Sequence, residues 1–397
     1  MRSGVAARPR FPPLRMRALP TGSQSLCLLT HEFFPQRGGI ATFAEEMARA
    51  AARAGHAVEV WAPRSEATKP DWPFQVRRLA VAGTHNWGCQ VRLARELLRD
   101  RRRLRQSTIY LAEPGPMLVW MLLQFVGALR PRHLVLTVHG SEVLRFAHHP
   151  WRRRLAARLF ARADRISTLT AYTADLVRQH FPAATGKLVL TPGALRSDFA
   201  LGPPVLPRAN IRPVVLTVGR LHPRKGQLLT LQALNRLPEH LRTGLEYRLV
   251  GTEADPAYAR MLRAEAARSG LRVTFLGDVP DAELPAVYAG ADVFALTSIQ
   301  HGHSVEGFGL VYLEASAQGL PVVAHAVGGV AEAVADGRTG LLVSPDRPED
   351  LTAAFARVLA DGALRRRLGA EGQRWTARTS WAASAAALFG PGAGKPL

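Results

Sequence analysis

The chain has 397 residues, of which 47% are hydrophobic, so it is long enough for two or three domains that each bury a core. This composition excludes a disordered chain, and only two cysteines, Cys27 and Cys89, argue against a disulfide framework and fit a reducing compartment. The formal net charge of +21 is unevenly distributed, because residues 1–200 carry 31 Lys and Arg against 13 Asp and Glu, whereas residues 201–397 carry 21 against 18.

Much of this positive charge lies in two arginine clusters, Arg101–Arg105 and Arg152–Arg165. A one-sided field favours an anionic partner, namely membrane phospholipid, a phosphorylated acceptor or nucleic acid, although a charge run can also be only a solvated face. The clusters lack interleaved aromatic residues and no DNA-reading motif is present, so we expect no nucleic-acid partner. The longest apolar run, Met117–Leu129, has 13 residues, which is too short to cross a bilayer and predicts a buried helix.

The first residues of the chain, 1–24, are rich in Arg and Pro and lack a continuous apolar core, so we expect a disordered basic tail and no secretory signal. An apolar strand over 25–30 then precedes a helix over 41–54, with Gly38 and Gly39 on the turn between them. Glycines at this turn let a phosphate or a sugar approach the backbone N–H groups of the helix start, although a tight turn alone is the alternative.

Strands and helices continue to alternate up to residue 190. Within this run, residues 133–138 form a predicted buried strand that ends at His139 and Gly140. A histidine at the carboxyl end of a strand is well placed to face a cleft, although a lone histidine is more often structural. The Gly- and Pro-rich segment over 200–212 predicts a linker.

The second half opens with a strand over 214–220 that ends in Arg220, and Lys225 lies on the loop leading to the next helix. Two cations at this position can hold a diphosphate, the arginine with a planar fork and the lysine as a point charge. Two exposed basic side chains are the alternative, and Arg224 is a further cation beside them.

Two glutamates, Glu306 and Glu314, bracket a Gly-Phe-Gly turn and the start of an apolar helix that is expected between Gly309 and Gly319. The flanking buried strands are predicted over 292–297 and 321–325. In an open parallel sheet, the loop before such a helix lies at the carboxyl edge, where ligands bind.

The two carboxylates would be about 12 Å apart if the segment between them were fully helical. They are then too far apart to act on one atom, as a glycosidase pair does at roughly 5 to 9 Å, but a long ligand could meet both. Free N–H groups of Phe308, Gly309 and Leu310 would face an anion at the helix start. An ordinary loop with two solvated glutamates is the alternative.

The stretch Val305-Glu-Gly-Phe-Gly-Leu-Val-Tyr-Leu-Glu-Ala315 resembles the E-x7-E signature of family 4 of the retaining glycosyltransferases. Its form is similar to bacterial members that transfer mannose or N-acetylglucosamine to inositol lipids, thiol precursors and polysaccharides. The resemblance implies the GT-B fold, an α/β architecture of two Rossmann-like, doubly wound parallel-sheet domains facing a cleft. The implied domains are an acceptor-binding domain over 25–202, a nucleotide-sugar-binding domain over 203–375, and a segment over 376–397 that crosses back to the first domain.

The resemblance also implies roles for individual residues in catalysis. Glu306 would bind hydroxyls of the donor sugar, and His139 would contact the donor sugar and the acceptor side of the site. Arg220 and Lys225 match the family's Gly-Arg…Lys-Gly motif and would neutralise the departing diphosphate.

Other residues are implied in substrate binding. Glu314 would bind the ribose hydroxyls, and Gly38 and Gly39 resemble the family's glycine loop beside the diphosphate and the acceptor. The loop that follows Gly277 is where related proteins hold the nucleobase.

The implied reaction moves a hexose from GDP-mannose or a UDP-sugar to a lipid-linked, polysaccharide or other anionic acceptor. Configuration would be retained through same-face attack, with the departing phosphate taking the acceptor's proton. No cofactor is implied, and the lack of an Asp-x-Asp-like pair at a strand end predicts no obligatory metal. We expect the enzyme in the cytoplasm, with the basic first domain allowing a peripheral position on the inner face of the membrane.

Two other classes of protein stay open as alternatives. One is a nucleotide-sugar epimerase or a glycosidic phosphorylase on the same architecture. The other, more remote, is a basic nucleic-acid-binding protein.

Overall fold

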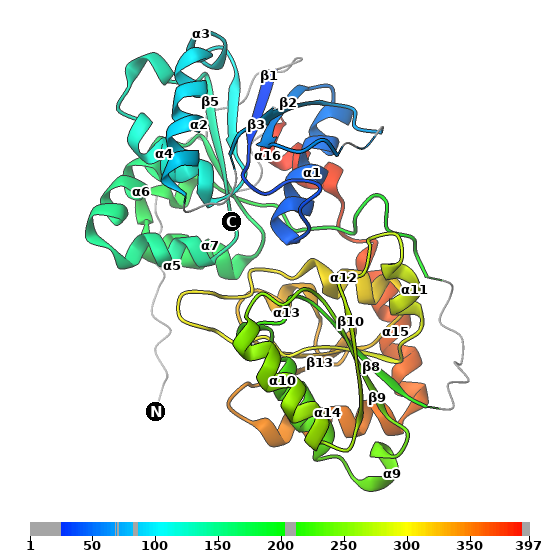
Figure 1. Cartoon of the computed structure of the whole chain (residues 1–397). Coiled ribbons are helices and arrows are strands. Elements are labelled where there is room, and N and C mark those ends of the chain that lie inside the picture. The colour runs from blue at the N-terminus through cyan, green and yellow to red at the C-terminus, as the bar shows by residue number, and fades with distance from the viewer. Residues whose placement is uncertain (1–24, 68, 70, 82–85, 203–211, 391–397) are drawn as a thin grey trace, which may run out of the picture.

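Two α/β units make up the computed structural model, which describes residues 25–67, 69, 71–81, 86–202 and 212–390 (Figure 1). Each unit is built on one parallel sheet, of seven strands in the first and six in the second. These two doubly wound parallel sheets confirm the fold class that the sequence predicts. The predicted tail over 1–24 and most of the predicted linker, residues 203–211, lie outside the described residues.

The first sheet has the strand order β3-β2-β1-β4-β5-β6-β7, and all of its described pairs are parallel. Its strands are β1 Ser25–Leu29, β2 Ala57–Pro63, β3 Gln75–Leu79, β4 Thr108–Leu111, β5 His133–Val138, β6 Arg165–Thr168 and β7 Leu188–Leu190. The chain order reverses between β1 and β4. At such a switch point, connections leave to opposite faces of the sheet and open a crevice at the carboxyl ends of the strands.

The helices of the first unit divide between the two faces of this sheet. α1 (Gly39–Arg53) belongs to one core cluster, whereas the apolar side chains of the helices that follow β3, β4 and β5 belong to another, as right-handed crossovers require. These further helices are α2 Trp87–Arg99, α3 Arg101–Leu104, α4 Pro114–Leu123, α5 Ser141–His148 and α6 Pro150–Arg162, and α7 Ala171–His180 follows β6. The hydroxyl of Thr170 starts α7 by accepting a 3.1 Å hydrogen bond from the N–H of Thr173.

The second sheet has the strand order β10-β9-β8-β11-β12-β13, and its switch point lies between β8 and β11. Its strands are β8 Val214–Val218, β9 Glu246–Val250, β10 Arg272–Gly277, β11 Val293–Leu296, β12 Val322–His325 and β13 Gly340–Val343. The helices are α8 Gln227–Asn235, α9 Glu239–Arg242, α10 Pro256–Arg268, α11 Leu284–Ala289, α12 Leu310–Ala317, α13 Val330–Ala333, α14 Pro348–Ala360 and α15 Gly362–Thr376. Side chains of α8, α10 and α14 share one core cluster, and those of α11, α12 and α13 share the cluster that reaches into the first unit.

The last helix, α16 (Trp381–Phe389), packs on α1 of the first unit. The Trp381 ring meets that of Phe43 edge to face at 5.3 Å between ring centroids, and its indole N–H donates to the carbonyl of Leu195 at 2.9 Å. Arg165, which is fully buried in β6, donates to the carbonyls of Leu388 and Gly390 at 2.9 Å each. The carbonyls at the end of α16 are thereby satisfied by a charged donor of the first unit.

The predicted single buried helix over the apolar run Met117–Leu129 is wrong. α4 ends at Leu123, and the side chains of Leu122, Phe125 and Val126 are 52%, 52% and 37% exposed. The helix stops because Val126 and Gly127 are poor helix formers, and only a short 3-10 turn over Gly127–Leu129 returns the chain to the core. In the part of the chain that the structure describes, no helix has the length and apolar character to cross a bilayer.

Candidate active site

The side chain of Glu306 lies between β11 and α12, at the carboxyl edge of the second sheet, and is 7% exposed. Three donors converge on its Oε2 atom: Lys225 Nζ at 2.7 Å, an Arg224 guanidinium nitrogen at 2.9 Å and Ser298 Oγ at 3.0 Å. Lys225 and Arg224 come from the loop after β8, and Ser298 from the loop after β11. The switch point of the sheet therefore brings these residues together, because β8 and β11 are neighbours in space.

The charge of Glu306 is fixed by these partners. Burial alone would raise its pKa, but the positive charges of Lys225 and Arg224 and the hydrogen bonds from Lys225 and Ser298 outweigh burial and lower the pKa to about 2. Burial lowers the pKa of Lys225, and the charge of Glu306 opposes that change. At neutral pH the Glu306 carboxylate is thus ionised and accepts hydrogen bonds only.

Arg220 follows β8 by two residues, and its side chain is exposed. The two cations that the sequence grouped for a diphosphate thus differ in burial, although burial and also the charge of Arg220 lower the pKa of Lys225. Lys225 is buried against Glu306, whereas Arg220 stands at the surface of the same edge. The charge of Arg220 also lowers the pKa of Glu32 in the first unit, although burial raises that pKa by more.

Glu314 lies in the middle of α12 and is 7% exposed. The hydroxyl of Tyr288 in α11 donates to its Oε2 atom at 2.9 Å. Burial raises the pKa of Glu314, and the charge of Arg196 in the first unit offsets part of that increase. Since Glu306 and Glu314 are both buried, the alternative of two solvated glutamates is wrong.

The start of α12 lies against the first unit. Gly309 has φ of 85°, and a Cβ at this position would lie 2.6 Å from the ring of Tyr312, so only glycine fits. The side chains of Phe308 and Leu310 lie against Gly193, in the loop after β7. The N–H groups of Phe308, Gly309 and Leu310 donate to no other described residue, so they stay available at the helix start.

His139, at the end of β5, meets the Glu306 loop from the other side. Its ring Nε2 lies 2.9 Å from the carbonyl oxygen of Ala112, which fixes the orientation of the imidazole. A side chain on Gly307 would collide with the His139 carbonyl, so the two backbones are in close contact. Ser141 Oγ accepts from the N–H of Val305 at 3.0 Å, and Thr170 Oγ1 donates to the Gly307 carbonyl at 3.0 Å.

Gly38 and Gly39 form the exposed start of α1, and no atom lies within 4 Å of the position that a Cβ would take in either. The neighbouring Arg37 donates to Asp278 Oδ1 at 3.1 Å and to the Val279 carbonyl at 2.8 Å, both on the loop after β10. The glycine loop of the first unit is therefore joined to the loop after Gly277 in the second.

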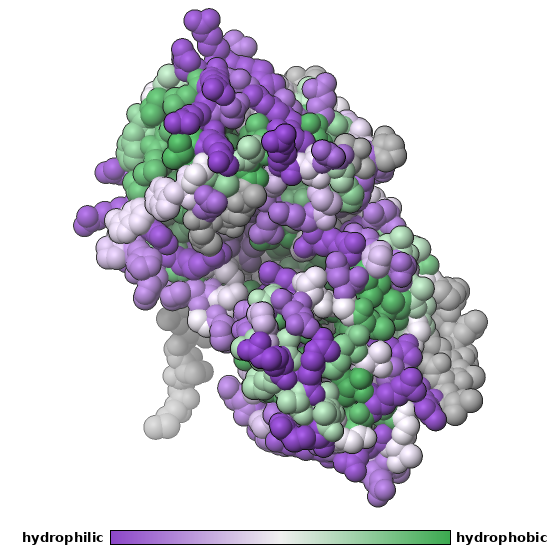
Figure 2. All heavy atoms as spheres, in the orientation of Figure 1, coloured by the Kyte–Doolittle hydropathy of each residue, from purple (hydrophilic) through white to green (hydrophobic). Residues whose placement is uncertain are grey.

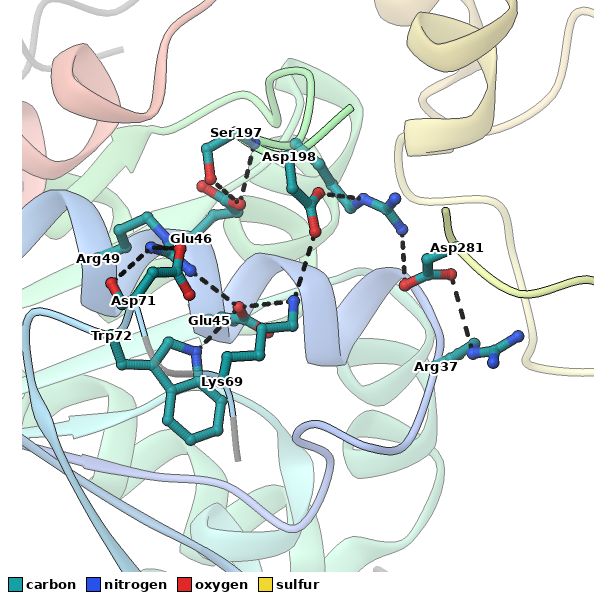
Figure 3. Close-up of polar contacts among 11 residues, drawn as sticks. Arg37, Glu45, Glu46, Arg49, Lys69, Asp71, Trp72, Ser197, Asp198 and Asp281 are labelled. Carbon is teal, nitrogen blue, oxygen red and sulfur yellow. Dashed lines mark hydrogen bonds and ion pairs between the residues drawn. The ribbon is translucent and has the colours of Figure 1, made fainter. Parts of the chain in front are cut away.

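A second arginine strengthens the same junction. Asp281 accepts from Arg196 at 2.9 Å and lies 3.8 Å from Arg37, and Figure 3 shows its carboxylate between the two units. From there the network continues through Asp198 and Lys69 to Glu45 on α1.

Comparison with known proteins identifies the family of the chain. Residues 37–199 match the family model described as Glycosyltransferase Family 4, and residues 203–375 match the one described as Glycosyl transferases group 1. A GDP-mannose-dependent alpha-(1-6)-phosphatidylinositol monomannoside mannosyltransferase from Mycolicibacterium smegmatis is 31% identical over 364 residues, which cover 88% of this chain and 93% of the relative. The chain belongs to glycosyltransferase family 4.

Solved structures share the fold of this family 4 glycosyltransferase. Sucrose-phosphate synthase from Thermosynechococcus elongatus superimposes with a TM-score of 0.75 at 24% identity, over 91% of this chain and 96% of that one. Anabaena HepE in complex with UDP and glucose gives 0.73 at 22% identity, over 91% and 97%. At these identities the likeness establishes the GT-B fold alone.

The candidate site contains two carboxylates that were not predicted from the sequence, those of Glu113 and Glu32, beside Glu142, which follows His139 by three residues. Glu113, after β4, is fully buried and accepts from the N–H groups of His31 at 2.9 Å and Gly115 at 2.6 Å. Burial raises its pKa to about 8, because these two hydrogen bonds only partly stabilise the charged form. Glu32, after β1, and Glu142, in α5, complete an acidic group at the switch point of the first sheet. The sequence could have indicated these carboxylates only through their positions after predicted strands.

Arg224, Ser298 and Tyr288 were not predicted as partners of the two glutamates, although Arg224 was noticed as an extra cation. Arg224 and Ser298 reach Glu306 through the pairing of β8 with β11, and Tyr288 reaches Glu314 through the packing of α11 on α12. Neither kind of contact leaves a local mark in the sequence. Among the residues that the structure describes, no group of three or more His, Cys, Asp and Glu side chains is placed to hold a metal ion.

Proposed function

We propose that this glycosyltransferase transfers mannose from GDP-mannose, with retention of configuration, to a hydroxyl of a lipid-linked acceptor. The observation that carries the proposal is the buried Glu306 carboxylate, held by Lys225 and Arg224 beside His139 at the contact between the units. The named activity of the Mycolicibacterium smegmatis relative supports the choice of donor and acceptor, since the identity extends over nearly all of both chains. The alternatives are a UDP-sugar as the donor and a polysaccharide as the acceptor.

In this proposal the second unit, residues 203–375, binds the donor. Arg220 and Lys225 neutralise the diphosphate, assisted by the free N–H groups at the start of α12. Glu306 accepts hydrogen bonds from hydroxyls of the mannose, for which its ionised state is suited. Glu314 accepts from the ribose hydroxyls, and Tyr288 holds it in place.

Guanine is the proposed donor base. The loop after β10 carries two partly exposed carboxylates, Asp278 and Asp281, whose side chains are 58% and 35% exposed and which also pair with Arg37 and Arg196. A guanine edge offers neighbouring N–H donors to one carboxylate, which accepts through two oxygens. Uracil offers a single N–H between two carbonyl oxygens, and a carboxylate repels both.

Retention is proposed from the resemblance to retaining family members, and the state of Glu306 argues against a covalent intermediate on its carboxylate. Its Oε2 atom accepts three hydrogen bonds and its pKa lies near 2, so it is a poor nucleophile toward the anomeric carbon. The acceptor hydroxyl then attacks on the face that the diphosphate leaves, and its proton passes to the departing phosphate. The sugar–phosphate bond breaks and one sugar–oxygen bond forms, so no external base or cofactor is needed.

The first unit, residues 25–202, is proposed to hold the acceptor, and the segment from 376 ties the donor unit to it. His139 and the segment that carries Gly38 and Gly39 lie at the contact with the second unit, against Gly307 and Asp278 respectively. A lipid-linked acceptor places the working enzyme at the cytoplasmic face of a membrane as a peripheral protein.

Thermal shift with nucleotides is the first test. GDP and GDP-mannose should stabilise the folded chain by about 2.7 kcal/mol at a hundredfold excess over Kd, and UDP by less, because a ligand that binds only the folded state adds its binding free energy. The anomeric configuration of the product made with phosphatidylinositol mannoside is then read by NMR. An inverted product contradicts retention, a free epimer or sugar phosphate contradicts transfer, and stabilisation by UDP alone contradicts the base assignment.

A further inference from the structure

The exposed apolar side chains of this enzyme gather on one face of the first unit. Figure 2 shows hydrophobic atoms over the left side of that unit, surrounded by hydrophilic ones. Seven of the ten large apolar side chains that are exposed in the described part of the chain belong to α2, the end of α4 and the start of α6, namely Trp87, Val91, Leu98, Leu122, Phe125, Val126 and Trp151. We call these residues the apolar face.

The three helices lie side by side on the same face of the sheet, since α4 packs on both α2 and α6. On α6, Trp151, Arg158 and Arg162 share one side of the helix, because spacings of seven and eleven residues return to the same direction. This side extends about 16 Å from Trp151 to Arg162 at 1.5 Å per residue. The apolar face is therefore one surface that crosses three helices.

Arginines stand directly among these apolar side chains. The guanidinium carbons of Arg158 and Arg162 each lie 5.6 Å from the centroid of the Phe125 ring, and that of Arg152 lies 5.1 Å from the Trp151 ring. Arg162 also donates to the carbonyl of Gln124, which fixes the end of α4 against α6. The guanidinium groups and the aromatic rings therefore lie on the same exposed surface.

Acidic side chains are almost absent from this surface. Residues 114–163 contain eight arginines and a single acidic residue, Glu142, which is 1% exposed. On α2 and just after it, Glu96 and Asp100 are paired with Arg77. The surface therefore presents positive charge that its own carboxylates do not cancel.

We propose that the apolar face docks the enzyme on an anionic phospholipid bilayer, with Trp151, Phe125 and Leu122 entering the interface and the arginines of α6 meeting lipid phosphates. Aromatic and aliphatic groups partition into the headgroup region while arginine heads stay with the anionic surface, so the two kinds of side chain act together. This inference deepens the proposed function by placing the lipid-linked acceptor, but docking does not depend on which donor is used.

Charge and chemistry favour a bilayer over other occupants. A second copy of the chain would bring two molecules of net charge +21 together, and their fields repel. Nucleic acid could use the arginines and stack on the aromatic rings, but it would leave the exposed aliphatic side chains of Leu98, Leu122 and Val126 without a partner. An anionic phospholipid bilayer can contact both the apolar and the cationic side chains of the face.

The position of the face next to the site also fits a lipid acceptor. Trp151 follows α5 closely, and the ring of His148 at the end of α5 lies 4.6 Å from that of His303 in the second unit. α5 and α7 lie at the end of the first unit that faces the second (Figure 1). The apolar face thus begins at the rim of the contact between the units, so a headgroup could enter there while its chains stay in the bilayer.

Vesicle flotation of the full chain tests the proposal. The vesicles contain phosphatidylcholine alone or with phosphatidylglycerol. One variant combines Leu122→Ser and Phe125→Ser, and its matched control combines Met261→Ser and Leu276→Ser, which are 47% and 40% exposed in the second unit. A second variant combines Arg154→Gln and Arg158→Gln, which lie within about 60° of Trp151 around α6, and it is matched by Arg357→Gln and Arg366→Gln, all four arginines being exposed. Every variant keeps residues 1–24, so any contribution of that basic segment is constant.

Binding to the anionic vesicles is expected to weaken about tenfold or more in both variants of the face, and to stay within about twofold of wild type in both controls. Equal behaviour of variants and controls overturns the proposal. So does a wild-type dimer in light scattering that becomes monomeric with Leu122→Ser and Phe125→Ser, or binding of an RNA oligonucleotide that weakens while vesicle binding does not.

A second readout separates this proposal from the proposed function. The shift of melting temperature with GDP should be the same in wild type, both face variants and both controls. If GDP stabilises none of them while flotation follows the expected order, the donor assignment fails and the docking face stands. If GDP stabilises all of them and flotation does not distinguish the variants, the docking face fails alone.

Discussion

The two sheets place carboxylates at their switch points in opposite electrostatic settings. In the second sheet, Glu306 is buried with two cations on one of its oxygens, and its pKa is held at about 2. In the first sheet, Glu113 is fully buried with backbone N–H groups as its described partners, and its pKa is raised to about 8. None of Glu32, Glu113 and Glu142 has an ion pair among the described residues.

The difference shows how one architecture can serve two kinds of ligand. Burial penalises a charge unless a partner compensates it, so a paired carboxylate stays ionised and an unpaired one retains its proton. The second edge, with its cations already in place, is suited to an anionic diphosphate. The first edge mixes groups that donate with groups that accept, which suits the hydroxyls of an acceptor. Substitutions at the two edges test this contrast.

Replacing Glu306 by Gln should reduce kcat by 10- to 1000-fold, or about 1.4 to 4 kcal/mol in the activation barrier, because one contact to the reacting sugar is lost. It also leaves Lys225 and Arg224 without their carboxylate. Steady-state kinetics with the donor measure the effect, and Glu371→Gln, at a surface ion pair of α15, is the matched control. A rate near that of wild type would remove Glu306 from the reaction.

Replacing Glu314 by Ala should raise the donor KM about 10- to 100-fold with a smaller change in kcat, since a binding contact away from the reacting atoms is lost. Tyr288→Phe provides the matched control, because it removes the hydroxyl that orients Glu314 but leaves the carboxylate in place. The control should raise KM by only a fewfold. Unchanged donor kinetics in the alanine variant would exclude a ribose contact.

Local patterns in the sequence predicted the second edge better than the first. The strands predicted over 292–297 and 321–325 are found over Val293–Leu296 and Val322–His325, because continuous apolar runs mark strands that are covered on both faces. The E-x7-E loop was also placed at the edge of the sheet, and both of its glutamates are buried there.

What the sequence could not predict depends on contacts between distant segments. Ser298 and Arg224 meet Glu306 only because β8 pairs with β11. Glu113 comes after an apolar strand, a position at which many residues are exposed to solvent. Its burial depends on the start of α4 and on His31 after β1. The apolar run into Phe125 has the composition of a core helix, and only the end of α4 at Leu123 exposes it.

The pH dependence of stability should distinguish the two edges. The pKa of Glu113 is raised from 4.5 to about 8 in the folded chain, so the folded state retains a proton that the unfolded state has lost. The contribution of Glu113 to the free energy of unfolding is therefore fully present below pH 4.5 and is lost as the pH rises toward 8. Glu113→Gln removes this titration, so we expect the stability of wild type relative to this variant to fall by about 1 to 3 kcal/mol between pH 6.5 and 9.

Urea denaturation across this pH range measures that difference. The range avoids His31, whose pKa is lowered to about 4 by burial and whose own effect appears as the pH falls below 6.5. Glu371→Gln is the control, and it should follow wild type at every pH. A constant difference between wild type and Glu113→Gln would mean that Glu113 does not titrate there, and the contrast between the edges would be lost.

The smallest effect is expected for Arg37, which approaches the carboxylate of Asp281 together with Arg196 at the junction between the units. Arg37 is 42% exposed, so Arg37→Gln should cost less than about 1 kcal/mol and still less at high salt. Arg196 is 10% exposed and its charge also lowers the pKa of Glu314, so Arg196→Gln should cost about 1 to 3 kcal/mol with little salt dependence and should raise the donor KM. Urea denaturation at low and high salt compares the two variants. Equal costs would show that exposure does not set the strength of these pairs, and the contrast drawn between paired and unpaired carboxylates would then need another cause.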